Sequence, residues 1–190
     1  LGFSVLDVVR RNPKELWVRG ERQVHPDGVL NLTQHTQVAM AVLAIAQVAE
    51  LREAGVLVDD AVACGHSVGE YDALSAYIGV LPLEAVVDIV WLRGCTMHTV
   101  VPRDAEGRSP YRMGVVRPNL AGLDHVEAEA LVAHVHEATG SFIQIVNHNV
   151  RDRQYSVTGE LAALDRFERS EEHTSELQSH HDLVCRLLLE

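Results

Sequence analysis

The chain has 190 residues, of which 47% are hydrophobic and 23% charged; this composition is typical of about one globular domain and excludes a disordered or collagen-like chain. Sixteen Lys and Arg against 27 Asp and Glu leave a net charge of −11, which argues against nucleic-acid binding. No charge-free apolar run is long enough to span a membrane, and three cysteines suit a reducing cytoplasm. We therefore expect a cytoplasmic protein with no nucleic-acid or membrane partner. Because the chain begins at Leu1 without a Met or a leader, we also expect a piece of a longer protein.

The first part of the chain predicts helices around one short strand. Residues 1–32 contain several Pro and Gly and predict a loop with a short helix. An Ala-, Val- and Leu-rich stretch predicts a buried helix over 36–54, which Gly55 ends. A short apolar run over 61–64 predicts a buried strand. The remaining predicted elements of this part are two helices and a polar loop, over 70–77, 82–99 and 102–110.

The pattern changes after this loop. The predicted elements are a strand, a helix, two strands joined by a turn, and a further helix, over 111–117, 124–139, 142–147, 154–158 and from 160 onward. The order β-α-β-β-α lacks one strand of a ferredoxin-like unit. We therefore predict an α/β core over 1–110 and a partial ferredoxin-like α+β subdomain over 111–168, both incomplete.

The last segment, 169–190, differs in character from the rest. Two stretches resemble the translation of a common sequencing-library adapter, namely RSEEHTSELQS over 169–179 and DLVCRLLLE over 182–190. The alternative is a native polar linker followed by the start of a helix. We expect an adapter-encoded tail and leave its histidines out of any candidate site.

The motif with the clearest chemistry is Gly-His-Ser-Val-Gly over 65–69, between a predicted strand and a predicted helix. In that context G-x-S-x-G is typical of a nucleophile elbow, a strained turn that projects the serine hydroxyl. The two glycines leave room for the tight backbone. Ser67 is then the candidate nucleophile, and the backbone N–H of Val68 is the candidate oxyanion donor. The alternative is an ordinary glycine-capped turn.

Arg93 is the next candidate site residue. On a helix over 82–99 it shares a face with apolar residues three, four and seven positions earlier. A guanidinium in apolar surroundings needs an anionic partner or an exit to water. One interpretation is an internal salt bridge with Asp88 or Glu84. The other is that Arg93 holds the free carboxylate of a substrate through two parallel hydrogen bonds.

Together these motifs resemble the malonyl-CoA:acyl-carrier-protein transacylase family. The matching motifs are G-H-S-x-G-E at 65–70, R-G at 93–94, T-Q at 33–34, and a hairpin between 146–149 and 156–159. The resemblance covers nearly all of 30–168. Over longer stretches, the sequence is most similar to the malonyl/palmitoyl transferase region of bacterial type I fatty acid synthases. We therefore expect one piece of a multifunctional chain.

The resemblance implies a hydrolase-like acyltransferase core with an inserted ferredoxin-like subdomain. It implies that Ser67 takes a malonyl group, or in the palmitoyl-accepting subgroup a long-chain acyl group, from coenzyme A. The acyl group then passes to the phosphopantetheine thiol of an acyl carrier protein, in fatty acid biosynthesis. Arg93 would hold the malonyl carboxylate. Gln34, Asn147 and Asn149 would line the substrate site, and the alternative for each is a structural role. No bound cofactor is implied, and the expected partners are the carrier domain and other domains of the synthase.

Two parts of the family pattern are not found in residues 1–168. A Gly-Gln-Gly-Ser-Gln segment with a further oxyanion donor would lie before Leu1, and the general-base His would lie after Glu168. His66 adjoins Ser67, but neighbouring residues at an elbow point apart. We therefore expect the isolated chain to be inactive. Apart from the His134/His136 pair, which we expect at the surface, the other histidines do not have the spacing of metal ligands, so no metal is expected.

Two alternative functions share the elbow. A serine hydrolase or thioesterase of α/β type would use the same serine, but it does not explain Arg93 on an apolar helix face. A polyketide synthase acyltransferase would use the same family motifs.

Overall fold

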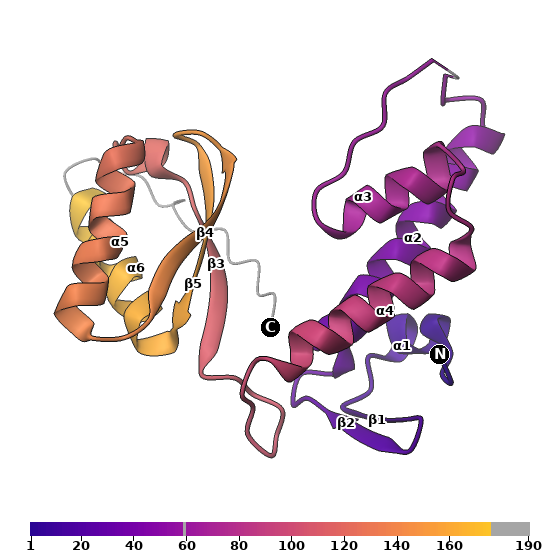
Figure 1. The fold of residues 1–190 in the computed structure, drawn as a ribbon, viewed down its shortest axis with the longest axis horizontal. Coiled ribbons are helices and arrows are strands. Elements are labelled where there is room, and N and C mark those ends of the chain that lie inside the picture. Colours follow the sequence, from indigo (N-terminus) through magenta and orange to yellow (C-terminus); the bar gives the residue numbers. More distant parts are fainter. Residues whose placement is uncertain (59, 176–190) are drawn as a thin grey trace. The chain divides into compact units, whose positions relative to one another are not determined.

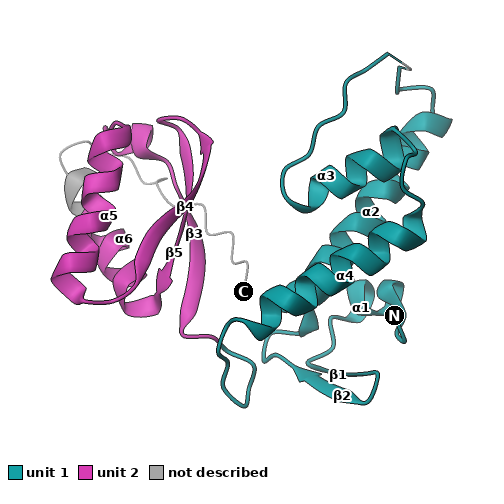
Figure 2. Cartoon of the chain, in the orientation of Figure 1, with its two compact units in different colours: residues 1–108 teal, residues 109–190 magenta. Residues whose placement is uncertain are grey.

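The computed structural model describes residues 1–58 and 60–175, which form two compact units (Figure 1, Figure 2). The first unit comprises residues 1–108, and the second begins at Ser109. No helix in the described part of the chain is long and apolar enough to cross a membrane. Most of the segment expected to be an adapter-encoded tail lies outside the described residues, and its origin stays a prediction.

The first unit consists mainly of helices. Its elements are α1 (Val5–Arg11), β1 (Glu15–Val18), β2 (Glu21–Val24), the 3-10 turn η1 (Val29–Asn31), α2 (Thr33–Glu53), α3 (Val68–Asp72), the π-helix η2 (Ala73–Tyr77) and α4 (Leu83–Thr99). The helices predicted over 36–54, 70–77 and 82–99 are confirmed, with boundaries shifted by a few residues, and α1 is the short helix expected within 1–32. Gly55 and Gly79 have φ values of 69° and 72° just after α2 and η2, in the left-handed region expected where a helix ends.

Helices α2 and α4 lie side by side and form the centre of this unit (Figure 1). Their apolar side chains meet in one buried cluster that includes Val38, Ala41, Val86, Val90 and Trp91. Gly94 allows the two backbones to approach closely, because a Cβ atom there would lie 2.4 Å from the Cα of Gln34. This close packing fixes the positions of α2 and α4 relative to each other, and these helices carry the candidate residues Gln34 and Arg93.

Residues 1–32 contain a β-hairpin that we did not predict. Strands β1 and β2 pair antiparallel, and the turn that joins them consists of Arg19 and Gly20, whose φ values are 53° and 86°. Positive φ at both central residues is typical of a type I′ turn, whose twist matches that of the two strands. The Arg-Gly pair was the local signal for this hairpin.

The prediction of a buried strand over 61–64 is wrong. These residues form no strand, and Val62 is 94% exposed. A strand needs a neighbour that satisfies its backbone N–H and C=O groups. Within the described residues no strand pairs with this segment, so its apolar composition alone does not make it part of a sheet.

The second unit is an antiparallel sheet with two helices on one face (Figure 1). Its elements are β3 (Tyr111–Val116), the 3-10 turn η3 (Pro118–Leu120), α5 (His125–Thr139), β4 (Ile143–Val150), β5 (Gln154–Glu160) and α6 (Leu161–Ser175). The strand order is β3-β5-β4, so the two strands joined through α5 flank the third. This is the split β-α-β arrangement of the ferredoxin-like fold, as predicted.

Local signals in the sequence set the limits of α5. The Asp124 side chain accepts a hydrogen bond from the Glu127 N–H, and the Glu127 side chain accepts one from the Asp124 N–H, both at 2.9 Å. This reciprocal pair is a capping box. Gly140 ends the helix with a φ of 66°. The buried face of α5 then packs into a cluster with β5 and α6 that includes Val132, Val135, Tyr155, Val157, Leu164 and Phe167.

Candidate active site

Ser67 lies at a strained bend at the start of α3. Its φ and ψ are 57° and −112°, although it is not a glycine, and α3 begins at the next residue, Val68. Such a conformation costs about 1–3 kcal/mol and persists where the surrounding structure imposes it. The residue is exposed. The bend has the character expected of a nucleophile elbow.

The two glycines of the motif contribute unequally to this bend. A Cβ atom on Gly65 would lie 2.0 Å from the carbonyl carbon and oxygen of Gly69, and 2.6 Å from the Glu70 nitrogen. A Cβ on Gly69 would meet no described atom within 4 Å. We expected both glycines to make room for the turn, and in the described structure the space is needed at Gly65.

Arg93 of α4 lies directly beside the serine. Its Nη2 donates a hydrogen bond to Ser67 Oγ at 2.8 Å, although 26 residues separate the two in sequence. Among the described residues Arg93 forms no ion pair with Asp88 or Glu84, the two carboxylates considered as internal partners. The packing of α4 against α2 and α3 thus brings the two main candidate residues together.

Gln37 of α2, which the sequence did not single out, contacts Arg93 in the candidate site. Arg93 Nη1 donates a hydrogen bond to Gln37 Oε1. The amide is oriented in turn, because Gln37 Nε2 donates to Thr33 Oγ1 at 2.8 Å and lies 3.4 Å from Met97 Sδ. Ser67, Arg93, Gln37 and Thr33 therefore form one hydrogen-bonded chain.

Gln34, the glutamine that we expected in the site, is directed elsewhere. It is buried, and its Nε2 donates to Gln23 Oε1 of β2 at 3.4 Å. Its backbone is the surface on which Gly94 packs. A Thr-Gln pair occurs twice, at 33–34 and 36–37, and the glutamine of the second pair is the one that reaches Arg93. This repetition was the signal that could have identified Gln37.

Val68 occupies the position expected of an oxyanion donor. It is the first residue of α3, and the first N–H groups of a helix have no partner within the helix. The next two N–H groups, of Gly69 and Glu70, donate to the carbonyls of His66 and Ser67 at 3.0 and 3.4 Å. The partial positive charge of the helix N-terminus favours a negative oxygen beside Ser67.

Asn147 and Asn149 lie on β4 of the second unit. Asn149 Nδ2 donates to Ser156 Oγ at 3.1 Å, and Asn149 Oδ1 is buried without a hydrogen-bond partner among the described residues. Both side chains are half-buried. Their contribution to the substrate site stays a prediction.

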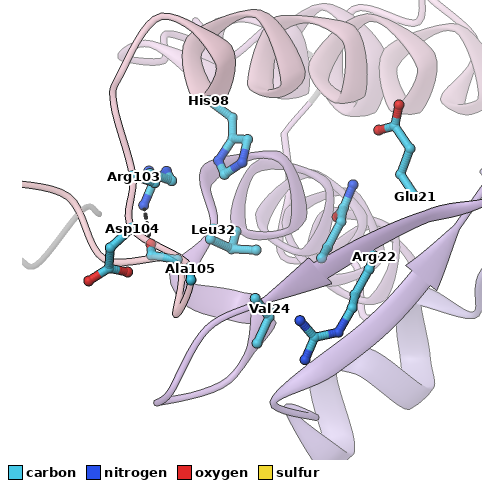
Figure 3. Close-up of a pocket in the computed structure, with 10 residues that line it drawn as sticks. Glu21, Arg22, Val24, Leu32, His98, Arg103, Asp104 and Ala105 are labelled. Carbon is cyan, nitrogen blue, oxygen red and sulfur yellow. Dashed lines mark hydrogen bonds between the residues drawn. The ribbon is translucent and has the colours of Figure 1, made fainter.

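A separate polar cavity of about 310 Å³ lies between β2, the end of α4 and the loop that follows it (Figure 3). Its lining includes Arg22, His98 and Arg103, and Arg103 donates to the Gly107 carbonyl at 2.9 Å. Burial, and then the charge of Arg103, lower the pKa of His98. Neither Ser67 nor Arg93 lines this cavity, so it is distinct from the elbow.

The sequence matches known proteins that agree with this geometry. Residues 1–182 match the family described as Acyl transferase domain. The chain is 41% identical over 142 residues to fatty acid synthase subunit beta of Schizosaccharomyces pombe. The aligned region covers 74% of this chain and 7% of that subunit. The chain is 39% identical over 140 residues to the corresponding subunit of Saccharomyces cerevisiae, covering 73% and 7%. The chain therefore spans only a small part of the length of these relatives.

Solved bacterial structures share the fold. The malonyl-CoA:acyl carrier protein transacylase of Xanthomonas oryzae is 27% identical with a TM-score of 0.60, over 86% of this chain and 47% of that one. The acyl-carrier-protein S-malonyltransferase of Burkholderia pseudomallei, at 24% identity, has a TM-score of 0.66 over 99% of this chain and 52% of that one.

With this fold, this elbow and these matches, the chain belongs to the acyl transferase domain family. Its relatives within the family are fatty acid synthase subunits and malonyltransferases. The predicted family and fold class are confirmed. The narrower resemblance to bacterial type I synthases stays a prediction.

Proposed function

We propose that this chain carries the nucleophile of an enzyme that moves malonyl groups from coenzyme A to an acyl carrier protein in fatty acid biosynthesis. The observation that carries the proposal is the 2.8 Å contact between Ser67 Oγ and the Arg93 guanidinium. A malonyl group has a carboxylate one methylene away from its reacting carbonyl. A nucleophile and a cation in direct contact suit an acyl group with a charge so close to the reaction centre.

In the proposed acylation step, Ser67 Oγ attacks the thioester carbonyl of malonyl-CoA. A C–O bond forms, the C–S bond breaks, and the hydroxyl proton ends on the departing coenzyme A thiol. The Val68 N–H stabilises the negative oxygen of the tetrahedral intermediate, as preorganised donors do in acyl transfer. In the second step the carrier's thiol attacks the serine ester and takes the malonyl group, which restores the hydroxyl.

The selectivity for malonyl rests on the charge of Arg93. The guanidinium is half-buried, and its hydrogen-bond partners in the described structure, Ser67 and Gln37, are neutral. A substrate carboxylate would supply the missing negative charge through charge-assisted hydrogen bonds. Because Gln37 binds one Nη, it sets the plane of the guanidinium before the substrate arrives.

The proposal includes the substrates, partners and compartment of the reaction. The substrates are a coenzyme A thioester and the phosphopantetheine thiol of a carrier domain, with no bound cofactor. The partners are that carrier and further domains of a fatty acid synthase, in the cytoplasm. The similarity to fungal synthase subunits supports this assignment. The described cysteines, Cys64 and Cys95, are free thiols, which fits a reducing compartment.

The test uses a longer protein that contains this chain, because we expect the isolated chain to be inactive. After brief incubation with malonyl-CoA, intact-mass measurement and peptide mapping should find a malonyl ester on Ser67. Ser67→Ala should remove the ester and lower transfer at least about 1,000-fold. Ser141→Ala, at a serine in the loop before β4, should leave both unchanged. An absent ester with transfer intact in Ser67→Ala would overturn the proposal. Rapid release of free malonate without a carrier would instead indicate a hydrolase.

A further inference from the structure

Two histidines and a glutamate meet in the second unit, away from the elbow motif in sequence. His125 is the first residue of α5, Glu129 lies one turn further along the same helix, and His148 lies on β4. One ligand atom from each of the three lies within 4.8 Å of the other two. We expected no metal site from sequence spacing, and 23 residues separate the two histidines along the chain. The packing of α5 on β4 brings them together.

The distances between these atoms suit a shared metal ion. Glu129 Oε1 lies 3.5 Å from His125 Nε2 and 3.4 Å from His148 Nε2. Two ligand atoms about 2.1 Å from a tetrahedral zinc ion lie roughly 3.4 Å apart. The Glu129 carboxylate oxygen is therefore already at ligand spacing from both imidazole nitrogens.

Buried groups around the cluster hold the His125 ring in place. The Tyr155 side chain is fully buried, and its hydroxyl lies 3.2 Å from His125 Nδ1. That hydroxyl also accepts a hydrogen bond from the Asp152 N–H at 2.7 Å. The His148 ring packs edge-on against both the His125 and Tyr155 rings. A hydrogen bond to the second ring nitrogen is the usual way in which a metal-binding histidine is oriented.

We propose that His125, Glu129 and His148 bind a divalent transition-metal ion, Zn²⁺ first. Two imidazoles and one carboxylate favour zinc over magnesium or calcium, which prefer oxygen ligands. With three protein ligands, a water molecule would complete a tetrahedron. The bound ion would link the first turn of α5 to β4, and so would stabilise the second unit.

The experiment titrates the 190-residue chain with zinc sulfate and follows the heat of binding. In parallel, diethyl pyrocarbonate modifies exposed imidazoles with and without Zn²⁺, and mass spectrometry reads each histidine separately. This second readout distinguishes the proposed site from metal bound by histidines near the C-terminus. We expect one Zn²⁺ at the site, with His125 and His148 both protected.

Three variants test the assignment. His148→Ala should weaken zinc binding at the site about 100-fold or more, since even outer-shell partners of metal ligands contribute about 10- to 100-fold. Glu129→Gln keeps the side-chain shape and should weaken zinc binding at least about 10-fold. This variant keeps the test valid if His148→Ala does not fold. His134→Ala, at an exposed histidine of the same helix, should change nothing. Equal modification of His125 and His148 with and without Zn²⁺, or equal affinity in all variants, would overturn the proposal.

Discussion

Two arginines, one in each unit, lie in different electrostatic surroundings. Arg93 on α4 donates to the Ser67 hydroxyl and to the Gln37 amide oxygen, both neutral. Arg112 on β3 has a side chain only 16% exposed, and it forms ion pairs with Glu168 at 2.8 Å and Asp165 at 3.5 Å.

We propose that this difference separates a structural cation, Arg112, from a functional one, Arg93. The charge of Arg112 is neutralised within its own unit, so the side chain joins β3 to α6. The charge of Arg93 has no carboxylate partner in the described part of the chain, which is unfavourable for a half-buried guanidinium unless an anion binds there. Departures of this kind from stable design are expected at functional sites.

The comparison is tested most directly by removing each arginine. Arg93→Ala should lower malonyl transfer about 100-fold or more, because charge-assisted hydrogen bonds to the substrate carboxylate are lost. Transfer of an acetyl group, which has no carboxylate, should change far less. Arg112→Ala should leave the malonyl-to-acetyl ratio unchanged and lower the free energy of unfolding by about 1–2 kcal/mol. Steady-state kinetics with both thioesters and urea denaturation measure these effects.

Arg93→Lys separates charge from geometry in the same assay. Lysine keeps the positive charge but not the planar guanidinium. The preference of Arg93→Lys for malonyl over acetyl should therefore lie between that of Arg93→Ala and that of the unaltered protein. Equal loss of malonyl and acetyl transfer in Arg93→Ala would show that this arginine positions Ser67 rather than the substrate.

A matched pair of glycines tests the packing of each unit. Gly94→Ala should lower the free energy of unfolding of the first unit by about 1–3 kcal/mol, because its Cβ would meet the α2 backbone at 2.4 Å. Gly114→Ala in β3 should change stability by less than about 0.5 kcal/mol, since no described atom lies within 4 Å of its Cβ. Hydrogen exchange resolved by peptide reports each unit separately. A stable Gly94→Ala protein would contradict the close contact of α2 and α4.

Acidification should destabilise the first unit through His35. Burial, and then the neighbouring His98, lower the pKa of His35 from 6.5 to about 4. Because the unfolded chain binds the proton more readily, the free energy of unfolding should fall as pH decreases from about 6.5 to about 4. The loss should not exceed about 3.5 kcal/mol, at ~1.4 kcal/mol per pKa unit. Urea denaturation at several pH values measures it, and His35→Gln should flatten the profile.

Gln34 and Gln37, near the start of α2, give the smallest expected effect. Gln37→Leu removes the acceptor that orients Arg93, so KM for malonyl-CoA should rise about 10-fold, as expected for the loss of about 1.4 kcal/mol. Gln34→Leu should leave KM nearly unchanged, because its amide faces Gln23. A larger rise in KM for Gln34→Leu than for Gln37→Leu would reverse this assignment.

Much of the fold followed from local patterns. The helix over 124–139 was readable because Asp124 and Gly140 are strong capping signals at its two ends, and both act as caps in the structure. The split sheet of the second unit followed from the order of its elements. The hairpin of β1 and β2 was missed because its strands are short and half-exposed and only the Arg-Gly turn marked them.

The elbow shows where local reasoning was incomplete. The G-x-S-x-G motif predicted a bend at Ser67, and the bend is present with a positive φ. The strand predicted before it, over 61–64, did not form, because pairing requires a neighbouring strand that an apolar run does not itself provide. Among the described residues, the Ser67 hydroxyl accepts a hydrogen bond from Arg93 of α4, a contact that the motif alone does not predict.

By itself, the sequence determined where most helices lie to within a few residues, that Ser67 lies at a bend, and which family the chain resembles. These features depend on residues that are close together along the chain, or on motifs that stay recognisable without coordinates. Only the tertiary structure decided that Gln37 rather than Gln34 reaches Arg93, and that His125 and His148 share a carboxylate. Such contacts depend on how helices and strands pack, and the period of a helix or strand specifies a face but not the residue that will lie opposite it.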